Sequence, residues 1–526
     1  MEPVKPYEKR WKALGVLILS LFVISLDNTI MNVTLPTLVR ELGASASQLQ
    51  WIVDAYVLVF AGLLLTAGSL GDRFGRKGTL TIGLVVFGAG SAIAAFAQTP
   101  EQLIATRAFM GIGGALIMPA TLSILTNIFP REERAKAIAI WSAVAGLGFG
   151  LGPALGGWML ERFWWGSVLL VNVPVVAAAV LLGHRLIPTS KDPHADRPDP
   201  IGAVLSIAGL AALLYGVIEA PRNGWTDVAS IGWLGAGFAL IAGFVAWELR
   251  SDHPMLDMRF FRNPRFTAAS VSITMSFFAL AGSLFFLTQI FQFLMGYSTL
   301  KAGVAILPAA LASAVGAPIG AAVAKRYGTK AAVTGGLVII AVGLGLVAAI
   351  TTTSGYGLLL MAMMVAGFGV GLAMTPATES IMGSLPPAKA GVGSAVNDTT
   401  REIGGALGVA VLGSLLVSGF TAGMADVTRG LPAAAAEIAR DSLGGALAVA
   451  AQVGGEAGRG LADAARTAFV DGTGLAMLIG AGFALAGALV ALVFLPARSE
   501  DADRQRVISV DVEPTLSEDL VAERAA

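Results

Sequence analysis

Residues 68–77 read GSLGDRFGRK and separate two long apolar runs, 49–70 and 79–97. Each run has about the 20 residues that a helix needs to cross the hydrocarbon core of a bilayer. The turn between them is rich in glycine, which permits close helix approach and unusual backbone angles. An ordinary basic loop needs no such spacing of glycine and aspartate, so we expect Asp72 to face a helix N-terminus of another part of the chain. The expected gating residues of the turn are Gly68, Asp72, Arg73, Gly75 and Arg76.

The same alternation of apolar runs and charged breaks continues along the chain. Its 526 residues are 55% hydrophobic and 13% charged, whereas a soluble domain carries about 25% charged residues. The 65 glycines would weaken soluble helices, but small residues let membrane helices pack closely. We therefore expect an all-α membrane protein with fourteen transmembrane helices, near 13–35, 49–70, 79–97, 102–125, 136–158, 167–187, 200–219, 229–249, 266–294, 300–323, 331–351, 356–381, 391–418 and 472–496.

Lysine and arginine gather on one side of these expected spans. They precede the first span and follow the second, fourth, eighth and tenth. By the positive-inside rule, both termini are expected in the cytoplasm, and the protein is expected in the inner membrane of a bacterial cell. The sequence contains no cysteine, which excludes disulfides, thiol catalysis and cysteine-ligated metals. We expect no metal site, no cofactor and no nucleic-acid partner.

The breaks in the apolar pattern divide the chain into parts. The expected parts are a six-helix bundle at 1–187, a linker with two inserted helices at 188–265, a second six-helix bundle at 266–496 and a cytoplasmic tail at 497–526. Within the second bundle, residues 419–471 predict a long extracellular loop that forms a short amphipathic hairpin from 437–452 and 456–469. An alternative, in which 442–455 dips into the membrane, stays open.

Two short stretches of the first bundle recur in the second. Residues 118–124 (MPATLSI) return as 375–381 (TPATESI), and residues 68–77 return as 321–330 (AAVAKRYGTK). Spans one to six therefore correspond to spans nine to fourteen. Duplicated bundles of this kind hold substrate at the midplane between the halves and alternate its access to the two sides.

Ionisable residues inside spans are costly and indicate a function. Asp27 lies well inside the first span, where a carboxylate among apolar side chains could exchange a proton for a cationic substrate; a structural carboxylate capped by hydroxyls is the alternative. Asp398 and Glu402 share one helix face and predict a second acidic site, unless Arg401 neutralises Asp398 as an inert ion pair. Asp54, near the outer end of the second span, either receives cations or is a water-exposed acid at a helix end.

Residues 148–157 (GFGLGPALGG) place Gly148, Gly152 and Gly156 on one helix face. This face is a groove into which a neighbouring helix can pack. Pro153 removes one backbone hydrogen bond and can kink the helix. Generic close packing explains the glycines equally well.

Four stretches, in this order along the chain, resemble signature motifs of the major facilitator superfamily. They are 26–36 (LDNTIMNVTLP), the loop 68–77, 103–115 (LIATRAFMGIGGA) with Arg107, and 148–157, which is similar to the fifth-span motif of the antiporters. The resemblance covers about residues 7–497, and the most similar subgroup is that of the fourteen-span drug/proton antiporters of the quaternary-ammonium type.

The resemblance implies the major facilitator fold, with two six-helix bundles and two inserted helices. It also implies a proton-coupled multidrug efflux antiporter, not an enzyme, in which Arg107 couples to a carboxylate during proton transfer. The expected partners are amphiphilic, cationic small molecules, protons and the lipid bilayer, and the expected functional unit is a monomer. An exporter of one antibiotic or secondary metabolite is the alternative. Some relatives carry acids where this chain has Asn397 and Ser313, so recognition of dications stays open.

Overall fold

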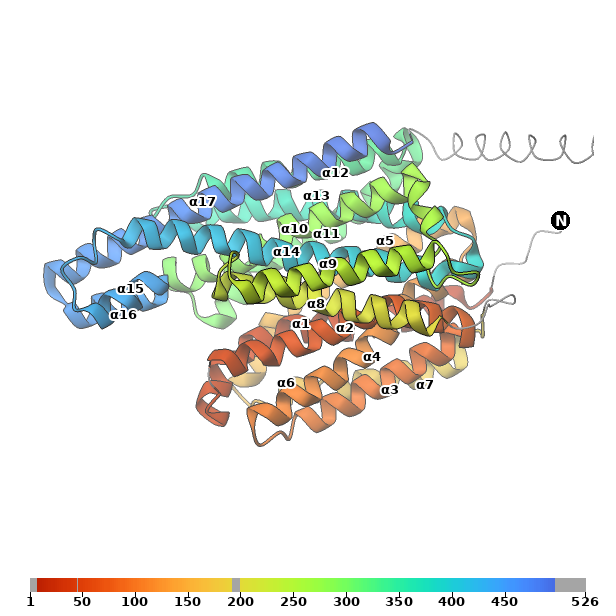
Figure 1. Ribbon diagram of the computed structural model, residues 1–526, viewed down its shortest axis with the longest axis horizontal. Helices are drawn as coiled ribbons and strands as arrows, with labels where there is room; N and C mark the ends of the chain where they lie inside the picture. Colours follow the sequence, from red (N-terminus) through yellow and green to blue (C-terminus); the bar gives the residue numbers. More distant parts are fainter. Residues whose placement is uncertain (1–6, 45, 192–198, 497–526) are drawn as a thin grey trace, which may run out of the picture.

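The computed structural model describes residues 7–44, 46–191 and 199–496, which form a bundle of long helices with no strand (Figure 1). The expected tail, 497–526, and residues 192–198 of the expected linker lie outside these residues. The long helices are α1 (Arg10–Leu42), α2 (Ala46–Phe74), α3 (Arg76–Ala94), α4 (Pro100–Ile128), α5 (Arg131–Leu160), α7 (Asn172–Leu186), α8 (Pro200–Asn223), α9 (Val228–Glu248), α10 (Pro264–Gln289), α11 (Thr299–Tyr327), α12 (Thr329–Ala348), α13 (Tyr356–Gly383), α14 (Ala390–Met424) and α17 (Gly455–Phe494). The shorter ones are α6 (Ser167–Leu170), α15 (Ala433–Asp441) and α16 (Leu443–Val453).

The number of membrane-length helices agrees with the sequence prediction. Thirteen helical segments of the described ranges are long and apolar enough to cross a membrane, and α6 and α7 together make one of them. α5, of 30 residues, is a further helix that packs along both α1 and α11. With α5, the bundle has the fourteen spans of the prediction.

Three of the helices begin with the same local signal, a polar capping residue followed by proline. Thr99, Asp199 and Asn263 each accept a backbone N–H of the first helical turn, at the start of α4, α8 and α10. Proline at the next position has no N–H to leave unpaired and has its φ angle already set for a helix. These signals define the first residue of α4, α8 and α10, and therefore where each of these three spans begins.

The helices form two bundles with an inserted pair between them. The first bundle contains α1 to α7, and the second contains α10 to α14 and α17. α8 and α9 pack side by side, and α8 lies against both α2 and α14, so the inserted pair covers one seam between the bundles. Aromatic contacts reinforce this position, because Trp51 of α2 lies 5.8 Å from Tyr215 of α8 and Trp225 donates a hydrogen bond to Ser414 of α14.

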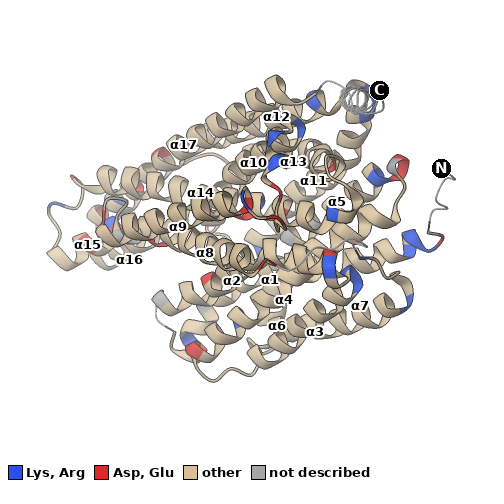
Figure 2. Ribbon diagram, turned by 45° about the vertical axis from the view of Figure 1, so that its right-hand side comes forward, with Lys and Arg blue, Asp and Glu red and all other residues tan. Residues whose placement is uncertain are grey.

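Charged residues are sparse along the middle of the bundle and concentrate toward its ends (Figure 2). We call the end that holds the start of α1 and the turn 68–77 the basic end, and the opposite end the far end. Lysine and arginine gather at the basic end, as Figure 2 shows, whereas α15 and α16 lie at the far end (Figure 1).

The two turns of the repeat share a glycine with a positive φ. Gly75 joins α2 to α3 with a φ of 114°, and Gly328 joins α11 to α12 with a φ of 91°. A side chain is strained at such angles, and the two glycines occupy the same position in 68–77 and 321–330. The second turn has Lys325 where the first has Asp72, so the repeat preserves the backbone of the turn but not its charge.

The segment at the far end differs in part from the expected hairpin. Residues 437–452 form most of α15 and α16, but 456–469 are the first part of α17, which runs unbroken for 40 residues. The prediction of a separate second helix there is wrong, because the glycines after it, such as Gly472, pack against α14 instead of ending the helix. A glycine inside a helix costs only about 1 kcal/mol relative to alanine, which such packing can offset.

Candidate functional site

A buried ion pair occupies the middle of the first bundle. Arg107 of α4 donates through Nη1 to Oδ2 of Asp27 of α1, and the two residues are 1% and 0% exposed. Arg107 is also held by its Nε, which donates to the carbonyl of Ile52 in α2 at 3.2 Å. Because removing one member of a buried pair leaves the other charge uncompensated, the pair is a strong constraint on how α1, α2 and α4 lie together.

The surroundings of Asp27 are polar, which corrects the sequence interpretation of a carboxylate among apolar side chains. Its Oδ1 accepts from Nδ2 of Asn172 in α7 at 3.0 Å, and the same amide nitrogen contacts Oγ of Ser91 in α3 at 3.1 Å. These partners could not be predicted from the sequence, because Asn172 and Ser91 lie far from Asp27 along the chain. The alternative interpretation, a carboxylate capped by hydroxyl groups, correctly predicted polar partners. The partners that the structure shows are an amide and a guanidinium instead of hydroxyls.

Tyr56 of α2 connects this ion pair to the second bundle. Its ring lies 4.4 Å from the guanidinium carbon of Arg107 and is stacked on Phe60 at 5.6 Å. Its hydroxyl is buried and has no hydrogen-bond partner among the described residues. The helix that carries Tyr56, α2, packs against α14 of the second bundle. Tyr56 therefore lies beside the buried ion pair, on a helix that packs against the one that carries the second acidic region.

The second acidic region lies on α14. Asp398 is 1% exposed and accepts from Nδ2 of Asn397 at 3.0 Å, while its other oxygen, Oδ2, has no hydrogen-bond partner in the described part of the chain. Glu402 follows one helical turn later and is half-buried. Three charges within two turns of α14 are therefore enclosed by the bundle, and Glu402 is the most accessible of the acids.

Arg401 does not form the direct ion pair with Asp398 that was the inert alternative. Its Nη2 donates to Oγ1 of Thr378 in α13 at 3.2 Å. Its guanidinium carbon lies 5.4 Å from the ring of Trp141 in α5 and 5.5 Å from the ring of Phe277 in α10. Arg401 therefore contacts aromatic rings of both bundles, an arrangement of the cation–π kind.

Asp54 lies on α2 between Ile52 and Tyr56, which both contact Arg107. It is half-buried, two turns into α2, and it has interactions with neighbouring residues. Among the described residues, no cluster of three or more His, Cys, Asp or Glu side chains is placed to hold a metal ion.

The turn 68–77 joins the two bundles at the basic end, through a set of contacts that we call the latch. Asp72 accepts from the backbone N–H groups of Gly391 and Val392, at the start of α14, at 2.8 and 3.1 Å. Arg76 donates to Asp72 at 2.7 Å and to the carbonyls of Pro387 and Ala388 at 2.9 Å. A carboxylate at a helix N-terminus is stabilised by the unpaired N–H groups and the helix dipole.

Glycine permits the close approach that the latch needs. A Cβ on Gly68 would lie 2.5 Å from the carbonyl oxygen of Gly391 and 2.7 Å from Cβ of Ala395. Gly75 is the positive-φ glycine of the turn. The guanidinium of Arg73 lies over the ring of the neighbouring Phe74, at 5.3 Å from its centroid.

The glycine face of α5 packs against α1 beside Asp27. A Cβ on Gly148 would lie 2.6 Å from Cβ of Ser25, one on Gly152 would overlap the hydroxyl of Thr29, and one on Gly156 would lie 2.7 Å from Ile30. Pro153 stands on the other side of α5, where Gly303 of α11 meets it. α5 thus touches the helix that carries the buried acid and, on its opposite side, the second bundle.

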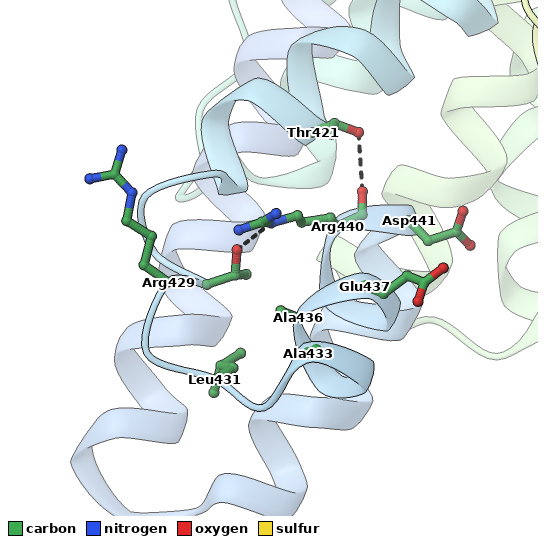
Figure 3. Close-up of a pocket in the computed structure, with 9 residues that line it drawn as sticks. Thr421, Arg429, Leu431, Ala433, Ala436, Glu437, Arg440 and Asp441 are labelled. Atoms are coloured by element: carbon green, nitrogen blue, oxygen red, sulfur yellow. Dashed lines mark hydrogen bonds between the residues drawn. The ribbon is translucent and has the colours of Figure 1, made fainter.

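A cavity of about 650 Å³ opens elsewhere, at the far end of the molecule (Figure 3). Arg440 of α15 crosses it and donates through Nη2 to the carbonyl of Ala425, while Oγ1 of Thr421 donates to the carbonyl of Arg440 at 3.2 Å. These bonds tie α15 to the end of α14. The cavity is lined by residues of 421–441 and is separate from the buried charges of the bundle.

The sequence comparisons identify one family. The model of the Major Facilitator Superfamily matches residues 17–409. The multidrug efflux pump LfrA of Mycolicibacterium smegmatis is 38% identical over 483 residues, which cover 92% of this chain and 95% of LfrA. The tetracenomycin C resistance and export protein of Streptomyces glaucescens is 32% identical over 92% of this chain and 91% of its own length.

Solved structures show the same fold. The crystal structure of the human organic anion transporter MFSD10 (TETRAN) superposes with a TM-score of 0.60 at 15% sequence identity, and covers 92% of this chain and 99% of MFSD10.

Proposed function

Because this chain belongs to the Major Facilitator Superfamily, we propose that it is a proton-coupled efflux antiporter that exports lipophilic, cationic drugs or biocides by alternating access. LfrA, a multidrug efflux pump, supports export as the direction of transport. Members of this family are carriers that leave their substrates chemically unchanged. The observation that carries the proposal is the pairing of Asp27 with Arg107, deep in one bundle and against the ring of Tyr56, whose helix packs against the acid-bearing α14.

We assign the proton to the Asp27–Arg107 pair. A proton on Asp27 removes the negative charge that Arg107 binds, so the guanidinium is left with the carbonyl of Ile52 and the ring of Tyr56. An uncompensated buried cation is unfavourable, and it drives α1, α2 and α4 to rearrange. Proton binding is thereby converted into a change of packing in the first bundle.

We assign the substrate's positive charge to the acids of α14. Glu402 is half-buried on α14, which packs against α2 and α4 of the first bundle, so a cation bound there adds charge near the helix that carries Arg107. Each elementary charge that crosses the membrane potential is worth about 2.3 kcal/mol per 100 mV. Export of one monocation against two protons would therefore use the voltage as well as the pH gradient.

The latch supplies the alternation of access. With the basic end in the cytoplasm, as the distribution of lysine and arginine favours, the contacts of Asp72 and Arg76 hold the cytoplasmic side of the two bundles together. Substrate entering from the cytoplasm or the inner leaflet then requires these contacts to break. The glycine face of α5 transmits the rearrangement of α1 toward α11, because α5 contacts both helices.

The experiment is ethidium transport into inverted membrane vesicles energised by a proton gradient. The intact protein is compared with Asp27→Asn and with Asp471→Asn, which makes the same chemical change at an exposed position of α17. We expect the gradient to drive ethidium uptake by the intact protein and by Asp471→Asn but not by Asp27→Asn. Gradient-driven uptake by Asp27→Asn at the rate of the intact protein would move the proton site to the acids of α14.

The similarity to an antibiotic exporter favours a second candidate, an exporter of one antibiotic or secondary metabolite. The two candidates differ in breadth. A panel of ethidium, a quaternary ammonium biocide and several polycyclic antibiotics distinguishes them, because the multidrug proposal expects transport of structurally unrelated cations. Transport confined to one antibiotic class would overturn the multidrug breadth and leave efflux in place.

A further inference from the structure

Arg401 contacts one residue of each bundle, Thr378 and Trp141. Thr378 belongs to one copy of the internal repeat, and Trp141 is hydrogen-bonded to the other copy. Arg401 donates to Thr378 in the second copy of the repeated PAT motif, at 375–381. Trp141, the ring that Arg401 approaches from the first bundle, donates through Nε1 to Thr121 in the first copy at 3.3 Å. The two threonines occupy the same position of the repeat, so the Arg401–Trp141 contact links the two copies of the repeat across the interface.

Arg401 occupies a place built for a cation. Trp141 is 0% exposed, Phe277 is half-buried, and both rings lie within 5.5 Å of the guanidinium carbon. Carboxylates stand on the same helix, three residues before Arg401 and one residue after it. Aromatic faces and nearby carboxylates are the features that recognise lipophilic cations.

The polar atoms of this group are not all satisfied. Oδ2 of Asp398 and Nε of Arg401 are buried without a hydrogen-bond partner among the described residues. Buried polar atoms without partners are costly, and an inert ion pair would have joined the two groups. Asp398 and Arg401 lie at i and i+3 of α14, on one face, so a change of side-chain rotamer can bring the guanidinium to the free carboxylate oxygen.

We propose that Arg401 is a built-in substitute for the cationic group of the substrate and sets the charge of the substrates that this site accepts. In the resting state the guanidinium lies against Trp141 and Phe277. An arriving lipophilic cation takes that place, Arg401 turns to Asp398, and Glu402 remains as the counter-charge of the substrate. With all three groups ionised, two carboxylates and one guanidinium leave a net charge of −1, which matches a monocation.

The inference rests on the efflux function proposed above and deepens it. It makes Arg401 the residue that discriminates against dications, because their second positive charge meets the guanidinium and finds no free carboxylate. Removing the charge of Arg401 leaves Asp398 and Glu402 with a net charge of −2, which suits a dication.

The test compares a monocation, tetraphenylphosphonium, with a dication, methyl viologen, in proteoliposomes that contain the full-length protein. The variants are Arg401→Gln, which removes the charge, and Arg401→Lys, which keeps it. Opposite charges at close range in a protein interior interact strongly enough that we expect the ratio of dication to monocation transport to rise about tenfold in Arg401→Gln. We expect the ratio in Arg401→Lys to stay at that of the intact protein, although both rates fall because an ammonium lacks the planar face of a guanidinium.

Binding of both cations to the purified protein in detergent is measured in parallel, since it requires no transport cycle. If Arg401→Gln no longer transports, the ratio of the dissociation constants for the two cations tests the proposal instead. We expect the same shift of about tenfold in favour of the dication. An unchanged ratio in Arg401→Gln, or an equal shift in Arg401→Lys, would overturn the proposal. An intact protein that binds these cations but exports none of them would instead refute the efflux function. In that case, the ratio of the two dissociation constants would still test whether Arg401 sets the charge preference.

Discussion

The latch yields a prediction with a magnitude. In Asp72→Ala, the bundles lose the two hydrogen bonds from Gly391 and Val392, and Arg76 loses the carboxylate that orients it toward 387–388. A hydrogen bond to a charged group contributes about 1.5–3 kcal/mol net. Two such bonds make the latched conformation less stable by about 3 kcal/mol or more relative to an unlatched one, and every 1.4 kcal/mol is a factor of about ten in the equilibrium.

The shift can be measured because the chain contains no cysteine, so introduced cysteines can be spin-labelled without background. Gly78 of α3 and Tyr327 of α11 are exposed at the basic end, one in each bundle, and a Cβ on Gly78 meets no other atom within 4 Å. We expect distances between labels at these positions to show one short population in the parent protein. In Asp72→Ala, a second, longer population should appear.

The control is Asp471→Ala, which removes an exposed carboxylate from α17 and should leave the distances unchanged. Asp72→Asn is informative as well, since its amide oxygen can still accept from α14 but carries no charge, so we expect an intermediate distribution. If Asp72→Ala gives the distance distribution of the parent under substrate-free conditions, the contacts of Asp72 do not hold the bundles together and the reasoning fails.

Three further predictions follow from single contacts. Gly152→Leu should lower thermal stability, by about 1–3 kcal/mol for an overpacked core, and reduce ethidium efflux, because the new side chain overlaps Thr29 of α1. Normal stability with normal efflux would show that close packing of α5 on α1 is not required. Gly75→Ala should lower the midpoint of thermal unfolding because the φ of Gly75 is 114°, whereas Gly78→Ala, three residues on, should not; equal midpoints would contradict the strain argument. Tyr56→Phe keeps the ring on Arg107 but loses the hydroxyl, so cation binding should persist while proton-coupled efflux slows; unimpaired coupled efflux would remove the hydroxyl from the mechanism.

The sequence predicted the fold well because membrane helices obey simple rules. Uninterrupted apolar runs must satisfy their backbone internally, so each becomes a helix, and basic turns mark where the runs end. The prediction failed in detail at 456–469, where a polar helix continues into the membrane span. Nothing in the local sequence distinguishes a helix that stops before a span from one that runs into it.

The partners of the candidate site residues were harder to predict. Asp27 was singled out as an ionisable residue inside a span and Arg107 through the resemblance to the family, and the structure brings them together. Asn172 and Trp141 were not singled out from the sequence. The role of a single asparagine or tryptophan in an apolar helix depends on the residues that it contacts on neighbouring helices. The signal that could have found Trp141 is the repeat, because Thr121 and Thr378 are equivalent positions and each accepts a hydrogen bond from a side chain of the interface.

The most direct measurement of the central claim is proton movement driven by substrate alone. Proteoliposomes with no initial pH gradient are loaded with a pH-sensitive dye, and an ethidium gradient is imposed across them. The antiport account predicts that protons move opposite to ethidium in the intact protein, and that Asp27→Asn abolishes this proton flux. Protons that move in the same direction as ethidium, or ethidium transport without any proton flux in the intact protein, would contradict it.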